Sequence, residues 1–222
     1  MSEEKAEPAW MADLRSVEGR CCSGFFFDAA ALIAPSSGAG SSRYVLTAAH
    51  FLREIRGAGA KVRVAYDGTW QWCDSWRLIP RTDLAVLRLP RAAAFDELPR
   101  LGSRVLWPGT RFTAGGFGAT STLRWRAGVF LFPMPWVASR GLSTRVTHGG
   151  YVAAWPRAIP GDSGGPVLVR GEVSAMQSMI FDPLGFNAGI AVVARIRPYL
   201  RAIRAAVLEL ASSASGNGEA AP

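Results

Sequence analysis

One serine of this chain lies in a segment that suits a nucleophile. Residues 161–166 read GDSGGP, which places Ser163 between an aspartate and two glycines and ends on a proline. A solvated turn uses the same residue types for backbone reasons alone. A tight, glycine-lined loop that holds a reactive hydroxyl needs them for chemical reasons. Because a serine hydroxyl is a weak nucleophile at neutral pH, the choice depends on whether the chain also supplies a base and an acid that orients it.

The chain has only two histidines, and histidine is the side chain best suited to act as a base near neutral pH. His50 follows YVLTAA, a predicted strand that delivers it to a turn. Asp83 stands at the start of the short apolar strand DLAVLRL. We interpret His148, in the segment THGG, as a surface or packing residue. His50, Asp83 and Ser163 are therefore the candidate catalytic residues.

The segments that contain these three residues resemble the motifs of one enzyme family. YVLTAAH resembles the histidine motif of the chymotrypsin-like (trypsin-fold) serine proteases, DLAVLRL resembles their aspartate motif, and GDSGGP matches their serine motif throughout. The motifs occur in the family's order, and the resemblance runs from about Cys22 to the closing helix. GGFG at 115–118 resembles the segment that starts the family's second barrel. Because Phe51 follows His50, the disulfide of secreted relatives cannot form, as in the short, disulfide-poor bacterial and viral branch.

The resemblance implies a fold, an activity and a role for each residue. It implies an all-β protein of two six-stranded antiparallel β-barrels, with the active site between them and a C-terminal α-helix. The implied activity is that of a serine endopeptidase, which cleaves protein or peptide substrates through an acyl-enzyme intermediate. Ser163 would be the nucleophile, His50 the general base and Asp83 the acid that orients His50. The backbone N–H groups of Gly161 and Ser163 would form the oxyanion hole, and no cofactor or metal is implied.

Asp162, beside the candidate nucleophile, needs a partner. In trypsin-type zymogens the corresponding aspartate pairs with an N-terminus released by cleavage, but no clear activation segment precedes Cys21. A buried carboxylate without a partner is strongly destabilising. We therefore expect an internal arginine or backbone amides to hold Asp162, and an enzyme that needs no proteolytic activation.

The specificity pocket is suggested only by analogy of position. Arg157 stands where trypsins carry an aspartate, so a preference for Lys or Arg at the cleavage site is not expected. Ser174, Ala175 and Met176 are expected to form the opposite wall. Met176 would narrow the pocket and favour small or medium apolar side chains, whereas an inward-pointing Arg157 would favour acidic ones.

Short strands must position these residues. Apolar runs and alternation at period two predict two groups of strands, and apolar residues at three- and four-residue spacing predict a closing helix. A short helix is predicted within residues 8–19. The predicted units are an N-terminal extension (1–20), a barrel with His50 and Asp83 (21–95), a barrel with Ser163 (104–195), the helix (196–211) and a disordered tail (212–222).

Composition limits the class of protein. The chain has 222 residues and is 49% hydrophobic, which is enough for one globular unit or two small halves. Its net charge is +8, but the basic residues are scattered, so nucleic-acid binding is not favoured. Three cysteines, two of them adjacent, make a poor disulfide framework, and no secretory or membrane-spanning segment stands out. We expect a cytoplasmic protein without membrane contact.

Two other functions fit parts of the pattern. A catalytically silent chain of the same fold would serve as a peptide-binding or regulatory module, because motifs alone do not establish geometry. A nucleic-acid-binding β-barrel would use the +8 charge but would leave the three motifs unexplained. A cytoplasmic protease also needs restraint, which a regulatory partner protein, the N-terminal residues or a narrow pocket would supply.

Overall fold

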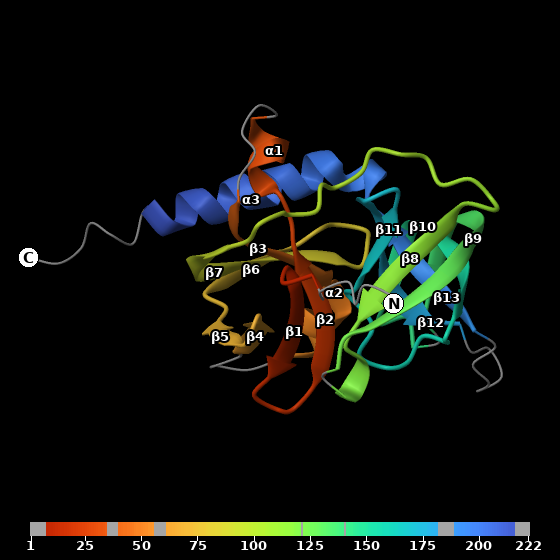
Figure 1. Cartoon of the computed structure of the whole chain (residues 1–222), viewed down its shortest axis with the longest axis horizontal. Helices are drawn as coiled ribbons and strands as arrows, with labels where there is room; N and C mark the ends of the chain where they lie inside the picture. Colours follow the sequence, from red (N-terminus) through yellow and green to blue (C-terminus); the bar gives the residue numbers. More distant parts are fainter. Residues whose placement is uncertain are drawn as a thin grey trace, which may run out of the picture.

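The chain forms two β-structures side by side, with a long helix that runs along one side of the molecule (Figure 1). The structure is a computed structural model that describes residues 8–34, 40–55, 61–120, 122–139, 141–181 and 189–215. Within these residues, the strands divide into an N-terminal sheet and a C-terminal barrel.

The N-terminal sheet is antiparallel and, in the described part of the chain, contains seven strands in the order β5-β4-β1-β2-β3-β7-β6. The strands are β1 (Met11–Ser16), β2 (Cys21–Phe26), β3 (Ser41–Ala48), β4 (Val62–Tyr66), β5 (Thr69–Trp72), β6 (Ser75–Leu78) and β7 (Leu84–Ala94). Two short helices, α1 (Ala29–Ile33) and α2 (Ala49–Glu54), follow β2 and β3.

The two strands that lead to the candidate base and acid are firmly buried. Val45 and Leu46 of β3 and Leu84 and Leu87 of β7 have no solvent exposure. Burying a side chain of this size stabilises the fold by about 1.5–3 kcal/mol relative to leaving it exposed. The end of β3 pairs with the start of β7 through Ala48 and Leu84. The packing therefore holds the residues just beyond these two strand ends close together.

Six strands of the C-terminal half close into a barrel in the order β10-β13-β12-β11-β8-β9. They are β8 (Arg111–Gly116), β9 (Arg124–Ala138), β10 (Arg145–Trp155), β11 (Pro166–Val169), β12 (Glu172–Ile180) and β13 (Ile190–Arg195). The short 3-10 helix η1 (Gly118–Thr120) follows β8. An apolar cluster that includes Phe112, Phe130 and Val193 fills the barrel.

The closing helix connects the two halves. After the 3-10 turn η2 (Arg197–Tyr199), α3 (Leu200–Ser215) leaves the barrel and packs against α1, β6 and β7 of the N-terminal half. Ile203, Val207 and Leu210 have no solvent exposure. Their three- and four-residue spacing places them on one face, which confirms the predicted helix and its apolar side.

The N-terminal region differs from the sequence prediction. Residues 11–16 form β1, which pairs with β2 and β4, so they belong to the sheet and are not a helix in a separate extension. The charges that obscured this strand are tolerated because Asp13, although buried, is paired with Arg15. The N-terminal half is also a seven-stranded sheet with β5 and β6 at its edges, where a closed six-stranded barrel was predicted.

The C-terminal boundary also moves. The helix continues to Ser215, beyond the predicted limit of residue 211 and into the predicted tail. Residues 216–222 of that tail, and residues 1–7 of the predicted extension, lie outside the described residues.

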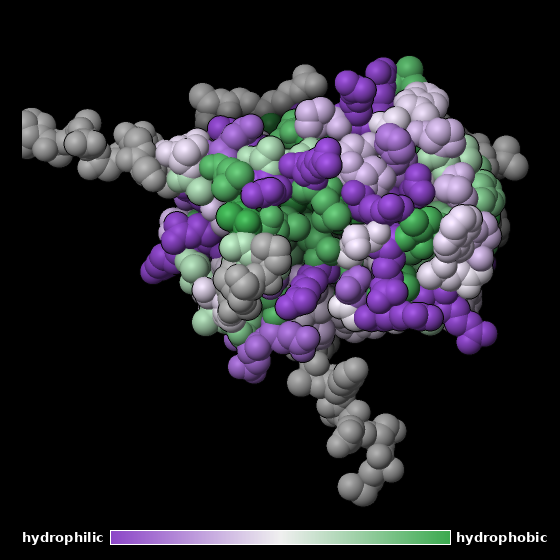
Figure 2. Space-filling model, turned by 90° about the horizontal axis from the view of Figure 1, so that it is seen from above, coloured by the Kyte–Doolittle hydropathy of each residue, from purple (hydrophilic) through white to green (hydrophobic). Residues whose placement is uncertain are grey.

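The surface mixes polar and apolar side chains. Seen from above, hydrophilic residues surround an apolar area near the centre of the view and do not form one continuous field (Figure 2). Several tryptophans are exposed, among them Trp107, Trp136 and Trp155. In the part of the chain that the structure describes, no helix has the length and apolar character needed to cross a membrane.

Candidate active site

His50 and Asp83 meet beside the paired ends of β3 and β7. His50 lies in the first turn of α2, directly after β3, and Asp83 immediately precedes β7. The Nδ1 atom of His50 lies 2.7 Å from Oδ2 of Asp83, and the backbone N–H of His50 donates to Oδ1 of Asp83 at 2.7 Å. Both carboxylate oxygens of Asp83 therefore contact one residue, which orients the imidazole.

Burial and charge act in opposite directions on His50. Burial of the ring lowers its pKa, whereas the charge of Asp83 and the hydrogen bond to it raise the pKa and prevail. The pKa of His50 consequently lies above its ordinary value of 6.5. With Nδ1 engaged by Asp83, Nε2 is the nitrogen that is left to accept a proton.

Ser178 connects the aspartate with the candidate nucleophile. Its hydroxyl donates to Oδ2 of Asp83, and its carbonyl oxygen accepts a hydrogen bond from the Ser163 hydroxyl at 2.8 Å. The register between β12 and β13 shifts between Gln177 and Met179, so Ser178 lies in a bulge outside the regular ladder. Ser178 has no distinguishing signal in the sequence, because a serine near the end of an apolar strand is common and the bulge depends on a distant partner strand.

The loop that presents Ser163 has two glycines with a positive φ. Gly161 has a φ of +93°, and a Cβ there would lie 2.4 Å from the carbonyl carbon of Gly118. Gly164 has a φ of +85°, and a Cβ there would lie 1.9 Å from the carbonyl oxygen of Ser23 in β2. Any other residue would combine backbone strain with a clash. These two contacts explain the glycines on either side of the serine.

Ser23 holds this loop from the N-terminal half. Its hydroxyl donates to the carbonyl of Gly161 at 2.8 Å and accepts the N–H of Phe117 at 2.9 Å. Its backbone N–H donates to the carbonyl of Ser163 at 2.8 Å. Among the described residues, the N–H groups of Gly161 and Ser163 have no acceptor, so both remain as donors at the surface of the loop.

Asp162 has the partners that the sequence analysis expected. Nη1 of Arg126, in β9, lies 2.7 Å from Oδ2 of Asp162, and the N–H of Ile159 donates to the same oxygen at 2.6 Å. The side chains of Arg126 and Asp162 are only 3% and 2% exposed. An internal arginine and a backbone amide therefore both compensate the buried carboxylate. Which arginine does so depends on the pairing of β9 within the barrel.

A pocket of about 250 Å³ opens beside His50 and Ser163. The segment before the serine forms one wall, and residues 177–180 at the end of β12 form another. Most of the side chains that line it are uncharged; the lining residues besides the catalytic pair are Thr144, Ala158, Ile159, Pro160, Asp162, Gln177, Ser178, Met179, Ile180 and Ala191. Because the carboxylate of Asp162 is paired with Arg126, the pocket presents mainly apolar surface.

The structure corrects the predicted lining of this pocket. Ser174, Ala175 and Met176 are 1%, 0% and 0% exposed and lie in the interior along β12, whereas the pocket uses the residues that follow them. Arg157 is exposed and does not line the pocket. Its side chain lies beside Gly189 instead: its Cγ is 3.5 Å from the position that a Cβ on Gly189 would occupy. The prediction failed because the register of β12, which no local pattern shows, decides which of its residues reach the opening.

His148 lies outside this pocket. It is an exposed residue of β10, and its Nδ1 lies 3.3 Å from the hydroxyl of Tyr199. It does not line the pocket beside Ser163. The structure thus leaves His50 as the histidine that is available to Ser163.

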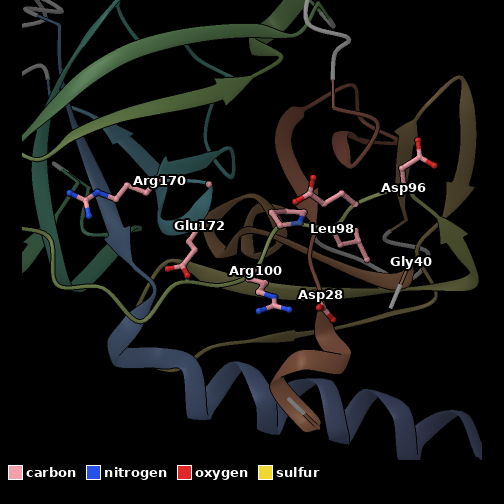
Figure 3. Close-up of a pocket in the computed structure, with 10 residues that line it drawn as sticks. Asp28, Gly40, Asp96, Leu98, Arg100, Arg170 and Glu172 are labelled. Carbon is pink, nitrogen blue, oxygen red and sulfur yellow. The ribbon is translucent and has the colours of Figure 1, made fainter. Parts of the chain in front are cut away.

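A second cavity, of about 520 Å³, lies between residues 96–100, which follow β7, and the turn from β11 to β12 (Figure 3). Its lining mixes acidic side chains, such as Asp28 and Glu172, with the basic Arg100 and Arg170. Its described lining includes no serine, cysteine or histidine and shares no residue with the described lining of the pocket beside Ser163. Across the described ranges, no group of three or more His, Cys, Asp or Glu side chains is arranged to hold a metal ion.

Sequence comparison relates the chain to known peptidases. The family model of the trypsin-like peptidase domain matches residues 22–176. An uncharacterized peptidase of Corynebacterium glutamicum (strain R) is 28% identical over 149 residues, which are 63% of this chain and 51% of the relative. The chain thus spans about half the length of the curated relatives it matches.

Solved structures share the fold. The active form of the Rv3671c protease from M. tuberculosis is 16% identical, with a TM-score of 0.64 over 85% of this chain and 76% of that chain. The HtrA-type protease AlgW with a tripeptide is 23% identical, with a TM-score of 0.64 over 89% of this chain and 60% of that chain. Kallikrein-related peptidase 10 is 21% identical, with a TM-score of 0.63 over 91% of this chain and 97% of that chain. At such identities the likeness shows a common fold and nothing finer.

Proposed function

Because this chain belongs to the family of trypsin-like peptidases, we propose that it is a serine endopeptidase whose catalytic residues are Ser163, His50 and Asp83. One observation carries the proposal. His50 is held by Asp83 at 2.7 Å, and both His50 and Ser163 line one pocket that is large enough for a side chain. In this proposal the N-terminal sheet takes the place of the first barrel of a two-barrel protease.

The proposed reaction follows from the contacts of each group. The Ser163 hydroxyl transfers its proton to Nε2 of His50 as its oxygen attacks the carbonyl carbon of the peptide bond. Asp83 accepts the hydrogen bond from Nδ1 and stabilises the imidazolium that forms. The N–H groups of Gly161 and Ser163 bind the oxyanion. His50 then gives its proton to the leaving amine, and water releases the acyl group from Ser163.

Before attack, the Ser163 hydroxyl must leave the carbonyl of Ser178. In the resting structure it donates to that oxygen at 2.8 Å. Rotation of a partly exposed serine side chain takes place in picoseconds to nanoseconds, which is far faster than catalysis. We propose that the incoming substrate displaces this contact, since the Ser178 carbonyl lies at the wall of the same pocket.

We also propose that the enzyme is active without proteolytic cleavage. The buried carboxylate of Asp162, which adjoins Ser163, already has Arg126 and the N–H of Ile159 as partners. A released N-terminus is therefore not needed to compensate its charge. An enzyme that becomes active only after cleavage near its N-terminus would contradict this part of the proposal.

The pocket favours small to medium aliphatic side chains at the residue before the scissile bond. Ala158, Ile159 and Ala191 line it, and Arg157, which would have attracted acidic side chains, does not. Profiling with a peptide library should give the highest kcat/KM with alanine, valine or leucine at this position. A preference for aspartate or glutamate that disappears in Arg157→Ala would contradict the assignment.

A serine-reactive fluorophosphonate probe tests the central claim. We expect the wild-type protein to be labelled and Ser163→Ala to remain unlabelled while folding normally. Peptide hydrolysis should fall at least about 10⁴-fold in Ser163→Ala and in His50→Ala. Absence of labelling in a folded wild-type protein would contradict the proposal.

A catalytically silent peptide-binding module is the second candidate, and one observation favours it. The Ser163 hydroxyl donates to the Ser178 carbonyl rather than to His50, so the nucleophile is not engaged by its base at rest. This candidate predicts peptide binding without fluorophosphonate labelling. The same probe therefore separates the two functions.

For the location we propose a reducing compartment, the cytoplasm. All three cysteines are free thiols, and burial raises the pKa of Cys22 to about 12, which keeps it unreactive. Labelling of the three thiols in protein taken directly from cells tests this, because a location outside the cytoplasm would be expected to oxidise the partly exposed Cys21 and Cys73.

A further inference from the structure

The glycines of GGFG, at 115–118, allow polar side chains to pack directly on the backbone beneath the Ser163 loop. A Cβ on Gly116 would lie 2.5 Å from Oδ1 of Asp162. A Cβ on Gly118 would lie 2.8 Å from Nη2 of Arg124. Both glycines are therefore needed to make room for charged groups, and one of these groups, Arg124, has no role in the mechanism described above.

Arg124 and Arg126 differ sharply in their partners. Two residues apart in β9, they extend to the same face of the strand. Arg126 is paired with Asp162 at 2.7 Å. Arg124 is half-buried, and its Nε and Nη2 atoms are fully buried without a hydrogen-bond acceptor. None of the ion pairs between described residues includes it. The site thus contains a guanidinium charge that no carboxylate of the described residues neutralises.

Only one residue separates this charge from the candidate oxyanion hole. The carbonyl carbon and oxygen of Gly118 lie 2.4 and 2.5 Å from a Cβ placed on Gly161. The side chain of Ile159, from the same loop as Gly161, reaches to 2.6 Å from the Cβ position on Gly118, where Arg124 also packs. Adding these contacts to the bond lengths within Gly118 and Gly161 places the guanidinium within about 10 Å of the Gly161 N–H.

We propose that Arg124 provides an uncompensated positive charge that stabilises the negative charge forming on the substrate oxygen in the oxyanion hole. Arg124 touches no substrate atom and acts through its field. The inference rests on the proposed function of Ser163 and Gly161. The oxyanion lies one hydrogen bond, about 3 Å, beyond that N–H, so the two charges are at most about 13 Å apart. At an effective dielectric constant of about 20, two unit charges at this distance still interact strongly enough to change a rate by about tenfold.

The same arrangement predicts a conflict between stability and rate. The two buried nitrogens of this guanidinium, Nε and Nη2, destabilise the folded state, because their N–H groups lose hydrogen bonds to water and gain none from the protein. A neutral side chain of similar length at position 124 should therefore make the protein more stable and the reaction slower. A residue with a purely structural role would show the reverse, since its removal lowers stability.

The test compares Arg124→Met, Arg124→Lys and the control Arg204→Met in the full chain. Arg204 is an exposed residue of α3, so its replacement removes the same charge at a position outside the site. We expect kcat for a peptide substrate to fall about tenfold in Arg124→Met with KM unchanged, and to stay within about twofold of wild type in Arg124→Lys and Arg204→Met. The Tm of Arg124→Met should rise.

A transition-state analogue provides a second measurement. A peptidyl boronic acid forms a negatively charged tetrahedral adduct with the serine, so its affinity should fall about tenfold in Arg124→Met. The affinity of a neutral product peptide of the same sequence should not change. Parallel loss of both affinities would indicate a distorted pocket and would overturn the inference.

The remaining outcomes are also decisive. Equal losses of kcat in Arg124→Met and Arg124→Lys would overturn the inference, because the lysine retains the charge. If Arg124→Met fails to fold, Arg124→Gln is measured in the same way, and a glutamine variant with wild-type kcat overturns it. A wild-type protein that the fluorophosphonate probe does not label contradicts the proposed function itself. A labelled wild type together with an unchanged kcat in Arg124→Met contradicts only the role of Arg124.

Discussion

Replacing Arg126 by methionine should be one of the most damaging single changes to this protein outside the catalytic residues. In Arg126→Met, the Asp162 carboxylate keeps the N–H of Ile159 but loses the only cation that pairs with it among the described residues. The two side chains are 3% and 2% exposed, so water cannot replace the guanidinium. Removing one member of such a buried pair costs about 3–5 kcal/mol, because the other charge is left uncompensated.

The assay is urea unfolding of the wild type, Arg126→Met and the double variant Arg126→Met/Asp162→Asn, followed by tryptophan fluorescence. We expect the free energy of unfolding to fall by about 3–5 kcal/mol in the single variant. The double variant should recover at least half of this loss, since it has no buried charge left to compensate. The exposed Arg204→Met, which lowers the net charge by the same amount, should stay within about 0.5 kcal/mol of wild type.

Two results would refute this reasoning. A loss below about 1 kcal/mol in Arg126→Met would mean that Asp162 does not depend on Arg126. A double variant no more stable than the single one would mean that the loss comes from missing packing and not from charge. Because Asp162 lies between Gly161 and Ser163, we also expect the rate of fluorophosphonate labelling to fall in the folded fraction of Arg126→Met.

Four further outcomes follow from individual residues. Because the pKa of His50 lies above 6.5, the base is lost as pH falls through that raised value, so the acid limb of kcat/KM should have its midpoint above pH 6.5; a midpoint below 6.5 would contradict it. The raised pKa also stabilises the folded protein: this contribution is complete below pH 6.5 and is lost as pH rises through the pKa of the folded state. In urea titrations, the loss of stability in His50→Gln should therefore be larger at about pH 5.5 than at about pH 9. Gly164→Ala should yield little soluble protein, because its Cβ would lie 1.9 Å from the carbonyl of Ser23; recovery of stable protein at the wild-type Tm would show that this contact is wrong. Ser178→Ala removes a donor to Asp83 and should lower kcat by about tenfold, and an unchanged kcat in the folded variant would exclude a positioning role for that hydroxyl.

The candidate catalytic residues were accessible from the sequence because each lies at the boundary of a local element. His50 follows the end of a buried strand, Asp83 precedes the start of another, and Ser163 lies in a loop whose glycines have specific backbone conformations. Strand ends and glycine-dependent turns depend on residues near in sequence. The closing helix was predictable for the same reason, since its apolar spacing lies within one segment.

The elements that were predicted wrongly are those whose secondary structure depends on pairing with strands distant in the sequence. β1 contains Asp13 and Arg15, which look like surface residues until the sheet pairs this segment with β2 and β4. Whether each half closes into a barrel also depends on how many strands it contains. The N-terminal sheet has seven strands because it includes β1, which lies in the segment that was predicted to be a separate extension.

The residue types and local motifs of the chain were enough to predict a nucleophile, a base and an acid, and an internal partner for Asp162. That this partner is Arg126, that Ser178 joins Asp83 to Ser163, and that residues 177–180 line the pocket could be learned only from the folded chain. The physical reason is that these contacts join different strands, and their register is set by the packing of the whole barrel and by a bulge in β12. No local pattern carries that information.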